Sequence, residues 1–228
     1  MSAGFYITGT DTGIGKTVAS TALLHALRAR GLRAVGMKPV ASGCERIDGA
    51  WRNEDATALQ EASDPRPDYA DINPYALPAA TAPELAARQA GIEIALAPIV
   101  DAHRRLAAQA DIVVVEGVGG WAAPLSAQLD QRDVVRALGV PVIVVVGLRL
   151  GCINHARLAA QAIAADGATL VGWIGNDIDP ALAQADAYFD LLRPRLAAPC
   201  LGRLPFSPQP SAEDLAAQID CGPLLSTG

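Results

Sequence analysis

The residues with the clearest chemical meaning lie in a glycine-rich stretch near the start of the chain. Gly9-Thr10-Asp11-Thr12-Gly13-Ile14-Gly15-Lys16-Thr17 follows the apolar run Phe5-Tyr6-Ile7 and precedes a helical pattern of alanines and leucines. A strand, such a loop and a helix, in this order, are typical of a phosphate-binding loop, whose N–H groups point at an anion. There the Lys16 ammonium would reach the β- and γ-phosphates and the Thr17 hydroxyl would bind Mg²⁺. Five residues separate Gly9 from Gly15, where the common pattern has about four, and the alternative is a turn that only joins strand to helix.

A second chemical group follows an unbroken β-branched run. Ile112-Val113-Val114-Val115 is typical of a central parallel strand, and Glu116 and three glycines (117, 119 and 120) follow it closely. In P-loop enzymes an acid at such a strand end holds Mg²⁺, although Asp is the commoner choice. The glycines would let a ligand approach the backbone closely. The alternative is that Glu116 only marks the end of a strand.

Three further polar residues occupy positions from which they could reach the same site. Lys38 ends a predicted strand and precedes Pro39; ligands gather at the carboxyl ends of strands in open α/β sheets, but a solvated lysine is the alternative. Asp55 lies in the first turn of a helix that Asn53 can cap, where the helix dipole alone favours a carboxylate. Asn176 ends another predicted strand and either contacts a base edge or makes a turn.

The elements that must position these residues alternate along the chain. Strands are predicted at 5–8, 33–37, 112–116, 142–146, 170–174 and 200–204. Helices are predicted at 16–30, 54–60, 84–89, 97–108, 133–138, 154–166 and 182–196, with a loop at 42–53 and an irregular, proline-rich connection at 64–83. The alternation predicts a single P-loop α/β domain of residues 1–228, with a central, mostly parallel sheet flanked by helices.

Composition narrows the class of protein. The 228 residues are 51% hydrophobic, which is enough for a sizeable core, and the net charge of −6 argues against a nucleic-acid partner. The longest apolar run, from Val140 to Leu148, is too short for a membrane span, which needs about 18 residues. Four cysteines without paired spacing predict reduced thiols in a cytoplasmic protein.

Several of these motifs together resemble the dethiobiotin synthetase family. The motifs that carry the resemblance are GTDTGIGKT (9–17), MKPVASG (37–43), RNEDA (52–56), VVVEGVGG (113–120), GCINHA (151–156) and the strand end at Asn176. The resemblance implies a cytoplasmic, homodimeric cyclo-ligase of biotin biosynthesis that depends on ATP and Mg²⁺. It implies that 7,8-diaminopelargonic acid and CO₂ are converted to dethiobiotin through a carbamate and a carbamic–phosphoric anhydride, with release of ADP and phosphate.

The resemblance also implies a role for individual residues. Lys38 and Lys16 would be the catalytic cations, and Thr17, Asp55 and Glu116 would bind Mg²⁺. The nucleotide would contact Gly13, Ile14, Gly15, Lys16, Thr17, Val18, Asp55, Glu116, Gly117, Val118, Gly119, Asn176, Asp177, Pro205, Phe206 and Ser207. The diamine would contact Thr12, Lys38, Ser42, Gly119, Asn154 and Tyr188, the last from the second subunit of the dimer. Other family members carry an acid at position 13, so only the backbone of Gly13 would matter.

Three other classes of function compete with this interpretation. A P-loop switch ATPase that acts on protein partners has a related fold, but its loop carries an additional lysine near its start, and positions 10–14 contain none. An amidotransferase-type ligase brings a glutaminase domain, for which 228 residues leave no room. A protein that only binds a nucleotide would not need Lys38 and Glu116 in addition to the loop.

Overall fold

The runs predicted as strands form one six-stranded parallel sheet in the computed structural model, which describes residues 3–209 and 211–225. The strands are β1 (Ala3–Gly9), β2 (Ala34–Met37), β7 (Ile112–Glu116), β8 (Val142–Leu148), β9 (Leu170–Asp177) and β10 (Cys200–Leu204). Their order across the sheet is β10-β9-β8-β1-β7-β2. Every residue of β7 and β8, which flank β1, is buried, as expected for central strands covered on both faces. The predicted fold class is confirmed.

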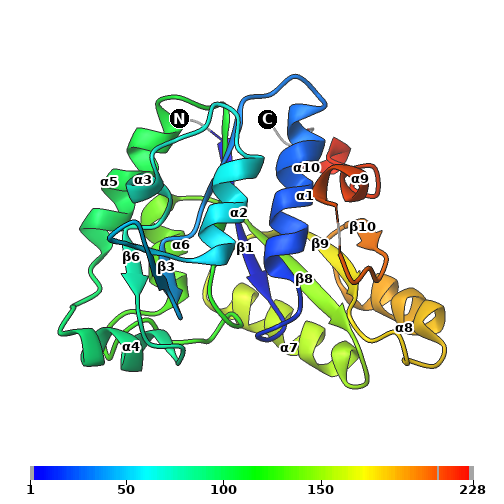
Figure 1. Ribbon diagram of the computed structural model, residues 1–228. Coiled ribbons are helices and arrows are strands. Elements are labelled where there is room, and N and C mark those ends of the chain that lie inside the picture. The colour runs from blue at the N-terminus through cyan, green and yellow to red at the C-terminus, as the bar shows by residue number, and fades with distance from the viewer. Residues whose placement is uncertain (1–2, 210, 226–228) are drawn as a thin grey trace.

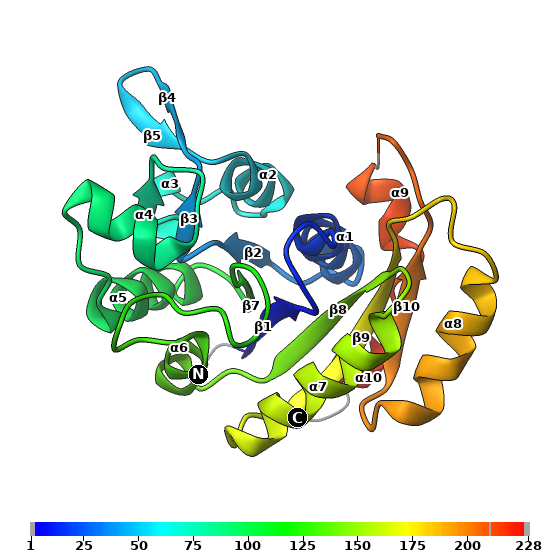
Figure 2. The ribbon, with the colours of Figure 1, turned by 90° about the horizontal axis from the view of Figure 1, so that it is seen from below.

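Helices cover both faces of this sheet (Figures 1 and 2). One face packs against α1 (Lys16–Arg28), α2 (Glu54–Ala62), α9 (Ala212–Ala216) and α10 (Gly222–Leu225). The other packs against α5 (Leu96–Ala107), α6 (Gln131–Leu138), α7 (Cys152–Ala165) and α8 (Ala185–Leu192). Strand β7 divides its side chains between the two cores: Val113 and Val115 enter one and Val114 enters the other, because successive side chains of a strand point to opposite faces.

The prediction of a loop at 42–53 was wrong. Most of that segment forms short strands: β3 (Val40–Ser42), β4 (Glu45–Ile47) and β5 (Ala50–Arg52). Strands β4 and β5 form an antiparallel hairpin that projects from the body of the molecule (Figure 2). Its turn, Asp48-Gly49, has φ angles of 50° and 81°, the left-handed conformation that an Asp-Gly hairpin turn adopts. The strands are short and largely exposed, and their polar and apolar residues do not alternate, so they lack the pattern by which strands are predicted.

The proline-rich connection at 64–83 is also more regular than predicted. It contains α3 (Tyr69–Ile72) and β6 (Tyr75–Leu77), and β6 pairs in parallel with β3 in a second small sheet. Helix α4 (Pro83–Ala90) follows. The buried Asn73 side chain donates to the carbonyl oxygens of Lys38 at 2.7 Å and Tyr75 at 3.2 Å. These contacts attach the connection to Lys38, the residue that follows β2.

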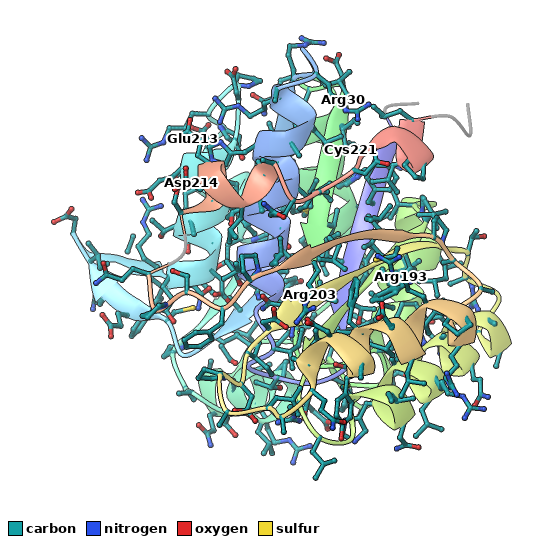
Figure 3. The ribbon with its side chains drawn as sticks, turned by 90° about the vertical axis from the view of Figure 1, so that its right-hand side faces the viewer. Arg30, Arg193, Arg203, Glu213, Asp214 and Cys221 are labelled. Atoms are coloured by element: carbon teal, nitrogen blue, oxygen red, sulfur yellow. The ribbon has the colours of Figure 1, made fainter. Side chains whose placement is uncertain are left out.

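The C-terminal third differs from prediction mainly in helix length. The helix predicted at 182–196 is shorter: α8 ends at Leu192 and a 3₁₀ turn, η1 (Arg193–Arg195), contains Pro194, whose ring cannot continue an α-helix. The segment after β10, for which no structure was predicted, forms α9 and α10. Figure 3 shows α9, with Glu213 and Asp214, crossing over α1, and Arg203 of β10 near Arg193. Asp220 N–H donates to the Leu201 carbonyl at 2.7 Å, so this segment covers part of the β10 edge.

Two further observations concern the lengths of the helices and the state of the cysteines. None of the helices within 3–209 and 211–225 combines the length and the apolarity that crossing a membrane requires. The four cysteines are free thiols, and Cys200 is the only one of them that is not buried.

Candidate active site

The predicted phosphate-binding loop connects β1 to α1. Gly13 and Gly15 have φ angles of 72° and 80°, values that a residue with a Cβ rarely adopts. Lys16 is the first residue of α1, and its ammonium donates to the Asp11 carbonyl oxygen at 3.0 Å. The loop is therefore closed on itself by the lysine that is expected to bind phosphate.

A cavity of about 430 Å³ lies beside this loop, at the carboxyl ends of β1, β2 and β7. Its lining residues come from segments far apart in the sequence: Thr12, Gly13, Gly15, Lys16, Thr17, Val18, Lys38, Ala41, Ser42, Asn53, Asp55, Glu116, Val118 and Gly119. The structure thus brings together the predicted catalytic lysines, the three predicted metal ligands and three of the predicted substrate contacts besides Lys38. Asn53 caps α2 as predicted, because its side chain accepts the Ala56 N–H.

The floor of the cavity is a cluster of opposite charges. Lys38 Nζ lies 2.5 Å from Glu116 Oε1 and 2.9 Å from Asp55 Oδ2. Thr17 Oγ1 donates to the same Glu116 oxygen at 2.9 Å. The side chain of Lys38 is 4% exposed and that of Glu116 is fully buried, so Lys38 is not the solvated lysine of the alternative interpretation.

Burial and these neighbours set the protonation of the cluster. Burial alone would lower the pKa of Lys38, but the carboxylates of Glu116 and Asp55 outweigh it and leave that pKa raised. Burial likewise would raise the pKa of Asp55, and Lys38 reverses the effect, so that pKa is lowered. Lys16 is different: burial and the positive charge of Lys38 lower its pKa to about 8. At neutral pH the cavity therefore holds two ammonium groups and an ionised Asp55.

Thr17, Asp55 and Glu116 form a set of oxygen donors that fits Mg²⁺. Glu116 Oε2 is buried and has no hydrogen-bond partner among the residues that the structure describes, and a buried carboxylate oxygen of this kind suits a cation. No group of three His, Cys, Asp or Glu side chains within the described residues could enclose a metal. Mg²⁺ commonly takes one or two carboxylates from a protein and completes its shell with water and phosphate oxygens, and Asp55 and Glu116 can supply two carboxylates.

Asn176 lies within β9, and its side chain contacts the loop. It is 6% exposed, and its Nδ2 donates to the Ile14 carbonyl at 2.9 Å. A Cβ atom at Gly15 would lie 2.1 Å from Asn176 Nδ2, so glycine is required there for this contact as well as for its φ angle. The neighbouring Asp177 carboxylate is paired with Arg203 at 3.0 Å.

The remaining predicted residues do not line the cavity. Asn154 is exposed on the first turn of α7, and Tyr188 on α8 packs partly against the hydrophobic core. Gly117 and Ile14 are buried beneath the residues that line the cavity. Pro205, Phe206 and Ser207 are exposed after the end of β10.

Sequence reasoning missed three residues beside the loops that line the cavity: Arg149, and the hydrogen-bonded pair Tyr6 and Gln131, whose amide bonds to the Val118 backbone. Arg149 directly follows β8, and its guanidinium is paired with the Asp11 carboxylate of the loop. The pKa of Asp11 is lowered, first by the hydrogen bond from Thr12 N–H and further by Arg149. The position of Arg149 at the carboxyl end of a strand could have identified this residue. Nothing in the local sequence marks Tyr6 and Gln131.

A glycine-rich loop between the first strand and helix of a parallel sheet, with two lysines and oxygen donors beside it, defines a P-loop nucleotide-dependent protein of the α/β class. The family model described as an AAA domain matches residues 3–214. Among curated relatives, the ATP-dependent dethiobiotin synthetase BioD of Xanthomonas euvesicatoria pv. vesicatoria is 67% identical over 94% of both chains. That of Xylella fastidiosa is 64% identical over 90% of both chains. The chain belongs to the dethiobiotin synthetase family.

Solved structures that are similar in fold are more distant in sequence. The cell division protein FtsY of Thermotoga maritima aligns with a TM-score of 0.57 and 16% identity over 94% of this chain. This chain spans 64% of the length of that structure's chain. The signal recognition particle receptor FtsY of Elizabethkingia anophelis has a TM-score of 0.53, 15% identity and coverage of 94% and 60%. At such low identity the likeness concerns the fold alone.

Proposed function

We propose that the chain, as one domain of residues 1–228, is an ATP-dependent dethiobiotin synthetase. The substrates are 7,8-diaminopelargonic acid, CO₂ and ATP, and the products are dethiobiotin, ADP and phosphate. The carrying observation is the cavity beside the phosphate-binding loop, in which Lys16, Lys38, Asp55 and Glu116 meet. The 67% identity with a named dethiobiotin synthetase over nearly the whole chain supports the same activity.

The proposed reaction passes through anions, which suits the two lysines. One amine of the diamine adds to CO₂ and loses a proton, forming a carbamate. A carbamate oxygen attacks the γ-phosphorus and ADP leaves, which gives a carbamic–phosphoric anhydride. The second amine then attacks the carbamoyl carbon, loses a proton and expels phosphate, closing the ureido ring. Positive charge fixed beside the transferring phosphoryl group stabilises this kind of transition state, and Lys38 and Lys16 supply it.

We assign the metal site to Thr17, Asp55 and Glu116. When bound, Mg²⁺ would neutralise charge on the phosphate oxygens. Two observations support the assignment: one oxygen of Glu116 has no hydrogen-bond partner among the described residues, and the lowered pKa of Asp55 keeps that carboxylate ionised. Lys38 holds these two carboxylates in place and would share them with the metal.

The nucleotide and diamine lie on opposite sides of the phosphate-binding loop in this proposal. Asn176, Asp177 and residues 205–207 would hold the adenine at the carboxyl ends of β9 and β10. Thr12, Ser42, Gly119 and Asn154 would contact the diamine. Because Thr12, Ser42 and Gly119 line the cavity with Lys38, the diamine nitrogens would lie near that lysine.

A homodimer in the cytoplasm completes the proposal, with Tyr188 reaching the partner's diamine site. Tyr188 does not line the cavity of its own chain. Leu150 and Leu158, next to and on α7, are 78% and 55% exposed, and Leu191 of α8 is 44% exposed, which supports an apolar interface in this region. A monomeric mass in sedimentation at working enzyme concentrations would contradict the dimer.

The proposed location in the cytoplasm agrees with the state of the cysteines, because free thiols support a reducing compartment.

One assay tests the function against the switch ATPase. ADP release is measured with and without 7,8-diaminopelargonate and bicarbonate, and dethiobiotin is quantified in the same reaction. We expect ADP release to require both compounds and to match dethiobiotin in amount. Fast ATP hydrolysis that ignores the diamine, with no dethiobiotin formed, would contradict the proposal.

A further inference from the structure

A buried amide lies beneath the glycine-rich loop at residues 117–120. Gln131, the first residue of α6, is fully buried, and its amide oxygen and amide nitrogen make two hydrogen bonds each. Its Oε1 accepts the Tyr6 hydroxyl at 2.7 Å and the Val118 N–H at 3.1 Å. Its Nε2 donates to the Val118 carbonyl at 2.9 Å and to the Gly120 carbonyl. Three of the four hydrogen bonds therefore hold loop backbone.

Tyr6 holds this amide from the other side. It is 2% exposed on β1, and its ring packs edge-on against Trp121 at a centroid distance of 6.5 Å. Burial, and then the negative charge of Glu116, raise the pKa of the Tyr6 phenol. The hydroxyl thus stays protonated as a donor, and its hydrogen bond fixes the amide with its oxygen toward Tyr6 and Val118 N–H and its nitrogen toward the carbonyls.

The loop rests directly on these two side chains. A Cβ atom at Gly117 would lie 2.2 Å from Gln131 Oε1 and 2.6 Å from the Tyr6 hydroxyl oxygen. Glycines at 117, 119 and 120 give the loop almost no side chains with which to anchor itself. Contacts from outside the loop must therefore set its position.

The other side of the loop faces the phosphate-binding loop. A Cβ atom at Gly119 would lie 3.5 Å from Thr12 Oγ1, and one at Gly120 would lie 3.4 Å from the Gly9 carbonyl oxygen. Gly119 and Thr12 both line the cavity. The distance of the 117–120 loop from Gln131 thus also sets the distance between this loop and the phosphate-binding loop, which form two walls of the cavity.

We propose that Gln131, oriented by Tyr6, is a positioning residue that fixes the 117–120 loop and thereby shapes the binding site of the diamine. This inference rests on the proposed function, since Thr12 and Gly119 are diamine contacts only if the diamine is the substrate. Gln131 acts through the loop backbone and does not itself line the cavity.

Hydrogen exchange tests the positioning without any substrate. Gln131→Met keeps the length of the side chain and removes every hydrogen bond to the loop. In the ligand-free protein, the Val118 amide should exchange faster by a factor of about ten or more, the equivalent of losing one hydrogen bond to it. Equal exchange in wild type and variant would overturn the proposal.

Kinetics test the consequence for the diamine. Gln131→Met should raise KM for 7,8-diaminopelargonate by about tenfold or more, because small displacements of positioning groups have large effects. The dissociation constant of ATP, measured without diamine, should change less than this KM, because the predicted nucleotide contacts at residues 13–18 lie in the phosphate-binding loop and α1, whereas the hydrogen bonds of Gln131 go to Tyr6 and the 117–120 loop. Tyr6→Phe, which removes one of the four hydrogen bonds, should have the same pattern with a smaller change.

Val134→Ala is the matched control. Val134 is a buried residue of the same helix that packs in the core, so its truncation destabilises α6 without removing a loop contact. We expect a lower unfolding temperature and an unchanged KM for the diamine. A KM that rises equally in both variants would reduce Gln131 to a stability role and overturn the proposal. If wild-type protein forms no dethiobiotin, the proposed function fails and so does the link to the diamine, whereas the hydrogen exchange of Val118 still tests whether Gln131 fixes the loop. If the wild type turns over and the Gln131→Met variant has an unchanged KM for the diamine, the positioning role alone is contradicted.

Discussion

Lys38 Nζ lies 2.5 Å from Glu116 Oε1; Glu116 ends β7, and Lys38 directly follows the neighbouring strand β2. The pairing of Met37 with Val115 in the sheet brings the next residues of both strands to the same edge. Neither side chain is more than 4% exposed. Removing one charge of such a buried pair leaves the other uncompensated, which is more costly than replacing both.

The first prediction concerns Lys38. Lys38→Met should lower kcat by about a hundredfold, the usual effect of losing one electrostatic donor to a transition state, while ATP binding weakens much less. The folded variant should be less stable by about 3 kcal/mol, since Glu116 stays buried without its cation. Single-turnover kinetics and urea unfolding measure the two effects. If kcat holds and only diamine affinity falls, Lys38 is a substrate clamp and the mechanism loses its second cation.

Glu116→Gln tests the metal site. The amide keeps the shape of the side chain but removes the charge and the unpartnered carboxylate oxygen, so half-maximal activity should require more Mg²⁺ by about tenfold or more. A Mg²⁺ titration at fixed ATP measures the shift. Glu54→Gln is the control: this acid is an exposed neighbour of Asp55 that does not line the cavity, and its Mg²⁺ requirement should equal that of wild type. An unchanged requirement in Glu116→Gln would mean that Glu116 serves only as the partner of Lys38.

Lys16 should make the ligand-free protein less stable at neutral pH. Its pKa is about 8 when folded, against 10.5 for an unperturbed lysine, so between these values the unfolded chain binds more protons. The free energy of unfolding therefore rises with pH between these two pKa values. Below pH 8 Lys16 is charged in both states, and the folded protein bears the full cost of burying that charge. Lys16→Met should increase the free energy of unfolding at pH 7 by as much as about 3 kcal/mol, and by much less at pH 10.

Denaturant unfolding at the two pH values checks this, together with ATP titration. The Lys16→Met variant should lose productive ATP binding while it gains stability, as expected for a group placed for function. A variant that is no more stable than wild type at pH 7 would contradict the lowered pKa. Normal turnover of the variant at subsaturating ATP would contradict its phosphate role.

Asn176 has one observed contact, with the Ile14 carbonyl, and one proposed contact, with adenine, and a comparison of two nucleotides can distinguish their effects. Asn176→Ala removes the hydrogen bond to the Ile14 carbonyl and any contact with the base. If Asn176 contacts adenine, ATP affinity should fall and its advantage over GTP should narrow, because an amide offers both a donor and an acceptor to a base edge. Binding isotherms for both nucleotides measure this. An equal loss for ATP and GTP would leave Asn176 only as a support of the loop.

The central sheet could be predicted because its strands are continuous apolar runs, such as Ile112 to Val115, that only a sheet covered on both faces would bury. The positions of Lys38 and Glu116 followed, since strand ends in a parallel sheet meet at one edge. The β4–β5 hairpin could not be predicted in this way, because its strands are exposed and its pairing depends on the Asp48-Gly49 turn. Gln131 was out of reach for another reason: its partner Tyr6 lies 125 positions away in the sequence.

The charges in the cavity sum to zero when Lys16 and Lys38 are protonated and Asp55 and Glu116 are ionised. A neutral crevice does not concentrate free anions, so orthophosphate or metal-free nucleotide gains little from entering it. A triphosphate that arrives with its metal is different: the cation can take the carboxylates while the phosphate oxygens take the ammonium groups. The cavity therefore offers a partner to each part of a metal–triphosphate complex, whereas the metal or the triphosphate alone would leave either the ammonium groups or the carboxylates without a new partner.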